Sequence, residues 1–278
     1  QMLGLCRFSY PALQDFQTAH ADIDARKAAL YAPARLDLRL TWFEHILLPG
    51  IRAQSDPDFT LLLLLGEDMP EPWRGRLLTL VGDIAQIVPV FRPPMHHRAV
   101  CREVLTEARD PDSPWVAEFR LDDDDAVATD FVARTRADFA AHGHGLAQEA
   151  GHLLIDYQRG ILVEVGPDGL ALHPLVARAW AAGMCLIYPP GETASLMDFP
   201  HHRVWWRMPS LTRPEPAMFL RGAHFTNDSP INRREGVSLK MGQAAVRRVI
   251  AQRFGVDLPA FRAALGGVGV VAGGPGGT

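Results

Sequence analysis

Five consecutive leucines constrain this fold more than any other feature of the sequence. They lie in the run Thr60–Gly66 (TLLLLLG), which is far too short to cross a membrane but has the length of a β-strand. A strand that is apolar on both faces is typical of a parallel sheet covered by helices. The run therefore predicts an α/β fold, with helices on both faces of an open, mostly parallel sheet.

Strand-like and helix-like segments alternate through the first half of the chain. Apolar residues recur at helical spacing over 34–48, and Pro49-Gly50 is expected to end that helix. The resulting order, βαβαβαβ with short connections, is typical of an open α/β sheet. The expected strands cover 2–10, 60–66, 84–91 and 115–121, and the expected helices cover 34–48, 72–82, 95–108 and a segment from Phe131.

The second half has a mixed pattern. Two turn signals, Arg159-Gly160 and the stretch 166–169, separate β-like runs and predict a hairpin or meander. After residue 190 the chain is irregular until about residue 238. The other expected elements are a short helix over 175–182, a strand over 184–190, helices over 240–254 and 257–265, and a flexible glycine-rich tail over 266–278.

Composition narrows the class of protein and its location. The net charge of −4 and the lack of a basic stripe argue against nucleic acid as the main partner. Three cysteines, Cys6, Cys101 and Cys185, have no metal-ligand spacing and fit a reducing compartment. We see no export signal and no apolar run that could span a membrane. We expect a cytoplasmic protein, with peripheral contact to the inner face of the cell membrane left open.

Four consecutive aspartates, Asp122 to Asp125, follow the expected strand 115–121. Like charges at this spacing repel unless a cation lies among them. In an extended segment Arg120, Asp122 and Asp124 would point one way and the other two aspartates the opposite way. Alternate carboxylates could then bind one Mg²⁺ or Mn²⁺ together with diphosphate oxygens. The other interpretation is an acidic cluster that complements the dipole of the following helix.

Several segments resemble known proteins. The stretch RLDDDDAVATDFV resembles the Asp-x-Asp pattern of GT-A glycosyltransferases. Together with GLCRFSY, RLTWFEHILLPGIRAQSDPDFTLLLL and FPHHRVWWR…GAHFTNDS, it resembles a bacterial family described as "Putative rhamnosyl transferase". The resemblance implies a GT-A-like domain over 2–265, with a nucleotide-sugar-binding half (2–150) and an acceptor-side half (151–265). It also implies a hexosyltransferase that takes a nucleotide-diphosphate sugar and an acceptor hydroxyl of a bacterial glycan or glycolipid.

The resemblance further implies roles for residues at the ends of the expected strands. Asp124 would be the main metal ligand, with Asp122 near the metal or the nucleotide ribose and Asp125 orienting the donor sugar or a water molecule. His224, in the segment GAHFTNDSP, would contact the metal or a donor phosphate, although a plain polar contact is the other interpretation. The donor-binding candidates are Arg7, Ser9, Arg98, Asp122 and Asp123.

An inverting transfer needs a general base, because the acceptor hydroxyl loses a proton as the new bond forms. The sequence offers Glu192, Asp198 and Asp228 for this role, with Asp125 as a further catalytic candidate, and does not choose between them. A β-linked rhamnosyl donor that gives an α-linked product would require inversion. Transfer with retention of the anomeric configuration is the alternative that stays open.

Other interpretations concern both the whole chain and single residues. A sugar nucleotidyltransferase also uses an acidic metal site on an α/β sheet, but it would carry a glycine-rich phosphate loop that GLCRFSYPAL lacks. A carbohydrate-binding protein without activity would not need the aspartates. Arg120 is expected to balance the aspartates structurally. The pair Trp205-Trp206, with His201-His202, could form a sugar platform or simply be part of the core.

Overall fold

The computed structural model describes residues 1–13, 22–166, 169–227 and 236–269. A seven-stranded sheet runs through it, in the strand order β10-β6-β9-β4-β1-β2-β3. The pairs β1–β2, β2–β3, β1–β4 and β6–β10 are parallel, and β9 is antiparallel to both β4 and β6. These strands are β1 (Met2–Arg7), β2 (Thr60–Gly66), β3 (Ile87–Arg92), β4 (Val116–Asp122), β6 (Leu153–Tyr157), β9 (Met184–Tyr188) and β10 (Ser210–Arg213).

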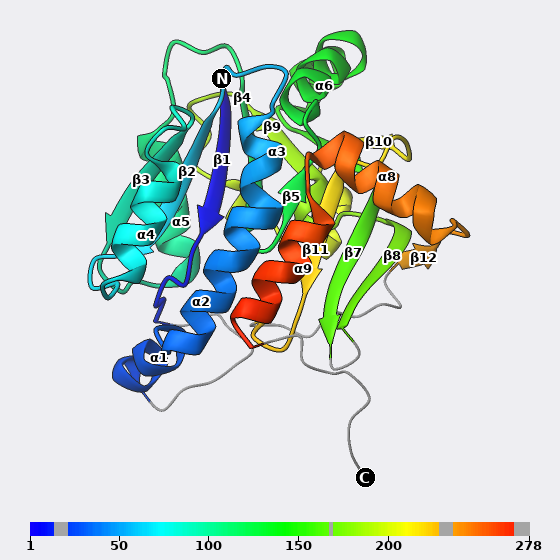
Figure 1. The fold of residues 1–278 in the computed structure, drawn as a ribbon. Helices are drawn as coiled ribbons and strands as arrows, with labels where there is room; N and C mark the ends of the chain where they lie inside the picture. The colour runs from blue at the N-terminus through cyan, green and yellow to red at the C-terminus, as the bar shows by residue number, and fades with distance from the viewer. Residues whose placement is uncertain (14–21, 167–168, 228–235, 270–278) are drawn as a thin grey trace.

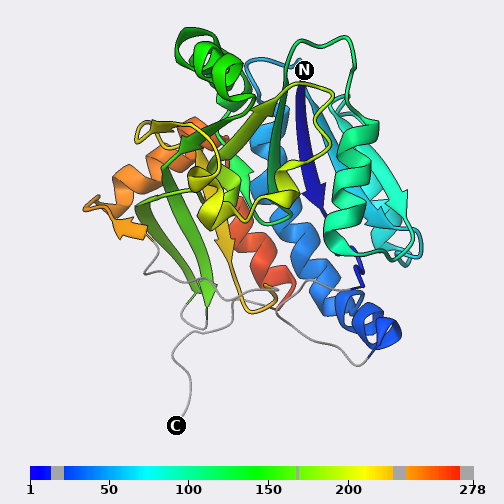
Figure 2. The ribbon, with the colours of Figure 1, turned by 180° about the vertical axis from the view of Figure 1, so that it is seen from behind.

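Helices cover both faces of this sheet, as the leucine run predicted. Figure 1 looks onto the face that α2 (Pro33–Trp42) and α9 (Leu258–Gly267) cover, and Figure 2 onto the face that α5 (His97–Glu107) covers. Two separate apolar clusters result, one on each face. The predicted α/β class with a mostly parallel sheet is therefore confirmed. The other helices are α1 (Ile23–Leu30), α3 (Leu48–Arg52), α4 (Trp73–Val81), α6 (Phe131–Asp138), α7 (His144–Ala150) and α8 (Gln243–Phe254).

A second, smaller sheet stands beside the first. Its strand order is β12-β8-β7-β11-β5, with β7 and β8 forming the predicted hairpin. The chain passes from β4 of the large sheet to β5 of the small one through the four-aspartate segment, so these aspartates lie where the two sheets meet. The strands are β5 (Ala126–Val127), β7 (Arg159–Gly166), β8 (Gly169–Ala177), β11 (Phe219–Ala223) and β12 (Gly236–Ser238).

The helix expected to end at Pro49-Gly50 continues to Arg52. A π-helical segment, η1 (Phe43–Leu47), joins α2 to α3, and the amide of Leu48 donates to the carbonyl of Phe43. Pro49 lacks an N–H and so interrupts the hydrogen bonding of this continuous helix without ending it, just after the π-helical segment. The prediction of a break was therefore wrong.

Two predictions in the second half were also wrong. Arg159-Gly160 is the start of β7 rather than a turn, because β6 and β7 belong to different sheets. The expected helix over 175–182 is replaced by the end of β8, which pairs with β12 through Val176 and Val237, and by a short 3₁₀ helix, η3 (Ala181–Gly183). Sheet pairing outweighs helix propensity here.

The section 191–238 contains more regular structure than expected. It holds β10, β11 and two 3₁₀ helices, η4 (Leu196–Asp198) and η5 (His201–Trp206). Strands β6, β9 and β10, from the second half of the chain, belong to the same sheet as β1, β2, β3 and β4 from the first half. The two halves expected on either side of residue 150 therefore share one sheet. Within the described part of the chain, no helix is long and apolar enough to cross a membrane. Most of the expected tail, residues 270–278, lies outside the described residues.

Candidate active site

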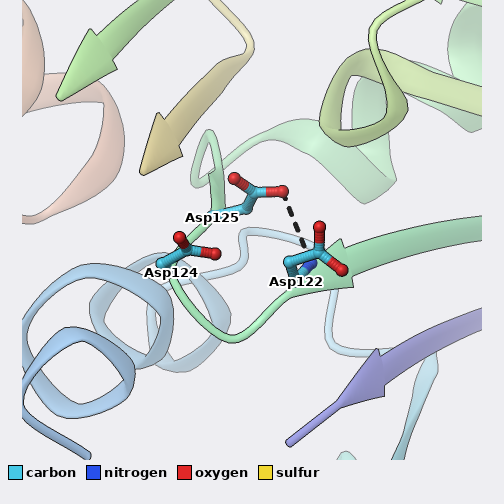
Figure 3. Close-up of side chains that lie close together, drawn as sticks. All are labelled: Asp122, Asp124 and Asp125. Atoms are coloured by element: carbon cyan, nitrogen blue, oxygen red, sulfur yellow. Dashed lines mark hydrogen bonds between the residues drawn. The ribbon is translucent and has the colours of Figure 1, made fainter. Parts of the chain in front are cut away.

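The four aspartates form a turn rather than a straight extension of β4. The amide of Asp125 donates to the carbonyl of Asp122 over 3.0 Å, and the amide of Asp122 donates to the Asp125 carboxylate over 3.3 Å. The turn brings the carboxylates of Asp122, Asp124 and Asp125 within 4.8 Å of one another (Figure 3). The expected alternation was therefore wrong for Asp125, because strand geometry ends at Asp122.

A buried arginine lies among the aspartates. Arg39, on α2, forms an ion pair with Asp123 and a longer one, 3.4 Å, with Asp124. All three side chains are almost fully buried, with at most 7% of each exposed. Sequence reasoning missed Arg39, although one signal was present: Arg39 stands between Leu38 and Leu40 in a helix that is apolar on both sides of it. A buried guanidinium requires a carboxylate partner.

The turn after β11 contacts Asp124 from the second sheet. Asn227 donates to the Asp124 carboxylate over 2.6 Å, and His224 Nε2 lies 3.1 Å from the same oxygen. The His224 amide in turn donates to the Asn227 side chain over 2.6 Å. Asn227 therefore fixes both the turn and Asp124.

Gly222 lets β11 approach the aspartate turn closely. A Cβ atom at this position would lie 2.6 Å from the backbone oxygen of Asp124. The Gly222 amide also donates to the Asp125 carboxylate over 3.2 Å. Any larger residue would push the turn away from β11.

The two central carboxylates differ in proton affinity. Burial alone would raise the pKa of Asp124, but the charge of Arg39 and the hydrogen bonds from His224 and Asn227 outweigh burial and hold it below its usual value. Burial raises the pKa of Asp125 well above its usual value, and the charges of Asp124 and Asp122 raise it further. Burial also lowers the pKa of His224, against the opposing effect of Asp124.

The acidic group has the composition that a hard divalent cation requires. Asp122, Asp124 and Asp125 supply carboxylate oxygens from three residues at one place. Within the described residues two guanidinium groups, those of Arg39 and Arg7, form ion pairs with these aspartates, so the four carboxyl groups outnumber their ion-pair partners. The pKa of the Asp125 carboxyl is raised, and a bound cation would lower it by stabilising the ionised form. The residues present therefore fit a divalent ion.

His224 contacts one member of this group, Asp124. It was expected to be a third ligand, yet its Nε2 atom lies 3.1 Å from both Arg39 Nη1 and Asp124 Oδ2. Its ring packs against Trp42, with centroids 4.9 Å apart. In this geometry His224 contacts Asp124 and Arg39, and the third carboxylate of the acidic group is that of Asp125.

Basic side chains line the edge of the sheet next to Asp122. Arg7, at the end of β1, lies 3.7 Å from Asp122 and 3.2 Å from His97 Nε2. Burial lowers the pKa of His97 to about 2, and the charges of Arg7 and Arg120 add to the effect. Arg120 points to the same face as Arg7, with its guanidinium 3.5 Å from the sulfur of Met197.

The remaining donor-binding candidates lie close by. Ser9, which follows β1, has a left-handed backbone (φ 46°) and its hydroxyl accepts from Arg35 over 2.9 Å. Arg98 is exposed at the start of α5. Arg120 makes no ion pair with the aspartates in the described part of the chain, but its charge interacts with that of Asp122, so it shares the charge balance with Arg39 and Arg7.

The structure does not bring one of the candidate bases, Glu192, to the aspartates. Because β9 is antiparallel to β4, with Tyr188 opposite Val116, Glu192 follows β9 at the edge of the sheet opposite to Asp122. Glu192 pairs with His152 over 2.9 Å, and a backbone hydrogen bond from Ala194 lowers its pKa.

Asp198 ends η4 and accepts from Arg102 Nε over 2.9 Å. Burial would raise the pKa of Asp198, but the hydrogen bond from Arg102 outweighs it and the pKa is lowered. The third candidate base, Asp228, lies outside the described residues.

Comparison with known proteins gives a family match. The model of the family described as "Putative rhamnosyl transferase" matches residues 1–236. No curated protein matches the chain. Among solved structures, residues 1–349 of S. aureus TarS in complex with UDP-GlcNAc are 12% identical, with a TM-score of 0.47, over 82% of this chain and 60% of that one. This chain thus spans about 60% of the TarS fragment.

Two further structures are more distant. The 4-diphosphocytidyl-2C-methyl-D-erythritol synthase of Anaerococcus prevotii is 7% identical with a TM-score of 0.32, over 90% of this chain and 94% of that one. A manganese complex of a Mycobacterium tuberculosis protein is 12% identical with a TM-score of 0.31, over 89% of this chain and 96% of that one.

Proposed function

The chain belongs to the "Putative rhamnosyl transferase" family, and on that premise we propose that it moves a sugar from a nucleotide-diphosphate donor to an acceptor hydroxyl. Family membership confirms the predicted enzyme class, glycosyltransferase. The observation that carries the proposal is the group Asp122, Asp124 and Asp125, whose carboxylates lie within 4.8 Å of one another at the carboxyl end of a central strand. Ligands of open α/β sheets bind at this edge.

We propose that these three aspartates hold Mn²⁺ or Mg²⁺, with Arg39 and His224 fixing Asp124. A divalent ion there would neutralise the charge that builds on the departing diphosphate. Arg39 keeps Asp124 ionised before the donor arrives, and Asn227 holds the Asp124 carboxylate in one orientation. These contacts orient the carboxylates for metal binding before the ion and the donor bind.

The basic edge next to Asp122 fits the donor diphosphate. Arg7 and Arg120 point to the same face, and Asp122 is the carboxylate in ion-pair contact with Arg7. His97, kept neutral by burial and by the arginines, can donate or accept one hydrogen bond there. We propose that this edge, with Ser9 and Arg98 at its rim, binds the nucleotide diphosphate.

The finer points of the proposal rest on the family's description. Rhamnose is the first sugar to test, with other hexoses beside it, and a bacterial glycan or glycolipid is the acceptor class. We also propose that the protein is located in the cytoplasm. Transfer is proposed to invert the configuration at the anomeric carbon of the sugar. Inversion needs a base, and Glu192 and Asp198 are poor choices because basic partners and lowered pKa values weaken both of them.

Asp228 is the base that we propose, because it follows Asn227 directly and Asn227 contacts Asp124. We expect Asp228→Asn to slow transfer by about 10²–10⁴-fold, the usual contribution of a general base. Glu192→Gln is the matched control and should leave the rate within a few-fold of the parent. Steady-state transfer rates at saturating donor measure both variants. Equal rates for Asp228→Asn and the parent would exclude this base.

The direct test of function is nucleoside diphosphate release from a panel of UDP-, dTDP- and GDP-sugars, with and without Mn²⁺. One nucleotide should support release in the presence of metal, and the same donor should raise the melting temperature, because a ligand that binds the folded state stabilises it. A panel with no response at all would contradict the proposal. A response to nucleoside triphosphate plus sugar phosphate would indicate a nucleotidyltransferase instead.

Metal binding should strengthen as pH rises. The raised pKa of Asp125 means that this carboxyl keeps its proton in the folded chain at pH values where a free aspartate has lost it. A cation must displace that proton, so affinity rises with pH up to the raised pKa and levels off above it. Without metal, stability falls over the same interval, because the folded state binds more protons than the unfolded state. Calorimetric Mn²⁺ titrations in two buffers of different ionisation enthalpy would count the proton, and an affinity that does not change with pH would contradict this account.

A further inference from the structure

A second surface, away from the aspartates, has chemistry that the proposed transfer does not use. It lies on η5, which packs against the α5 side of the large sheet through buried Val204 (Figure 2). At the end of this short helix Trp206 leaves 64% of its surface exposed. Residues 199–213 contain no acidic side chain. An exposed indole within an uninterrupted neutral and basic segment needs an explanation.

The indole of Trp206 is held in place by its neighbours. Trp205 meets it edge to face, with ring centroids 5.1 Å apart. The guanidinium of Arg178 lies 3.8 Å from the centre of the Trp205 ring and covers it. Because Arg178 occupies that ring, Trp205 does not present an open face to a sugar, and the exposed aromatic surface is that of Trp206. The sugar platform expected for the Trp205-Trp206 pair is thus reduced to one ring.

Three exposed arginines, Arg178, Arg203 and Arg207, lie in η5 or next to the Trp205-Trp206 pair. Arg203 lies three residues before Trp206, which places the two side chains on the same face of a 3₁₀ helix. Arg207 follows directly, and Arg178 stands over Trp205. Within the described residues none of the three arginines forms an ion pair, and only Arg178 acts on a carboxylate from farther away, that of Asp156. By contrast, exposed Arg52 and Arg76 are paired with Asp83 and Asp37.

We propose that this surface, Arg178, Arg203, Trp206 and Arg207, binds the anionic headgroups of a phospholipid membrane. Indole rings settle at the level of the headgroups, where one end is apolar and the other is wet. Each arginine close to an anionic membrane surface adds about tenfold or less to the affinity.

Cosedimentation with vesicles tests the proposal on the full chain. The protein should bind vesicles that contain phosphatidylglycerol, bind pure phosphatidylcholine vesicles weakly, and dissociate in high salt. The double variant Arg203→Glu with Arg207→Glu should weaken binding by at least about thirtyfold, which corresponds to about 1 kcal/mol per arginine. Trp206→Ala should weaken it by several-fold. All these side chains are exposed, so the variants should fold.

The matched control is Arg247→Glu with Arg248→Glu, which makes the same charge change on an exposed face of α8. If the control pair weakens binding as much as the η5 pair, the effect is one of net charge and the proposal fails. No binding of the parent to phosphatidylglycerol vesicles also overturns it. Unchanged vesicle binding with a raised KM for the acceptor in Trp206→Ala would assign the ring to sugar recognition instead. Donor hydrolysis, measured without vesicles, reports on the proposed transfer separately.

Discussion

Asp124→Asn should reduce transfer by at least about a thousandfold while the protein stays folded. Asp124 is the carboxylate that Arg39, His224 and Asn227 all contact, and its lowered pKa keeps it charged. The amide keeps the shape and one acceptor oxygen but removes the charge that would hold a divalent ion. Such an ion contributes several kcal/mol to the stabilisation of the transition state, which corresponds to about three powers of ten in rate. Transfer rates at saturating donor and metal measure the effect.

The control for this variant is Asp83→Asn, which changes an exposed aspartate that pairs with Arg52. It should leave the rate unchanged. Circular dichroism and urea unfolding of both variants separate lost chemistry from lost structure. Normal turnover by folded Asp124→Asn would show that the acidic group is not the catalytic centre.

Arg39→Met should cost about 3–5 kcal/mol of unfolding free energy. The substitution leaves Asp123 and Asp124 buried without their cation, and breaking a buried ion pair from one side is strongly destabilising. The exposed pair Arg52–Asp83, with a 2.7 Å contact, supplies the comparison. Arg52→Met should cost about 1 kcal/mol or less, as is usual for exposed pairs. Urea unfolding at neutral pH measures both.

A second substitution separates the charge of Arg39 from its packing. Asp123→Asn in the Arg39→Met background removes one of the stranded charges, so it should restore part of the lost stability. Added Mn²⁺ should also stabilise Arg39→Met more than it stabilises the parent, because the variant has one more uncompensated charge. If Arg39→Met unfolds at the same urea concentration as the parent, Arg39 is not the structural cation of the site.

The sequence predicted the parts of the fold that local patterns determine. The leucine run, the alternating helices and the acidic segment after β4 all lie where they were expected. Each of these signals is local: a period of apolar residues, a strand length, a change to polar residues at the end of a strand. The α/β class and the edge that carries the aspartates followed from them.

The parts that failed depend on contacts between distant segments. Arg39 and the aspartates are more than eighty residues apart, and nothing local pairs them. The shape of the aspartate turn depends on β5 pairing with β11, which a strand-alternation argument cannot include. The helix expected over 175–182 is lost to pairing of β8 with β12 for the same reason. Asn227 reaches Asp124 because β11 lies against the turn.

The close approach of β11 to the aspartate turn has a consequence for protein engineering. Gly222 leaves room for the backbone of Asp124, and Asn227, in the turn that follows β11, donates a hydrogen bond to the Asp124 carboxylate. A chimaera that exchanged the C-terminal segments to alter acceptor choice would therefore also exchange Gly222 and Asn227, which contact Asp124. Such a chimaera should fold best when residues 219–227 and the aspartate turn come from the same parent protein.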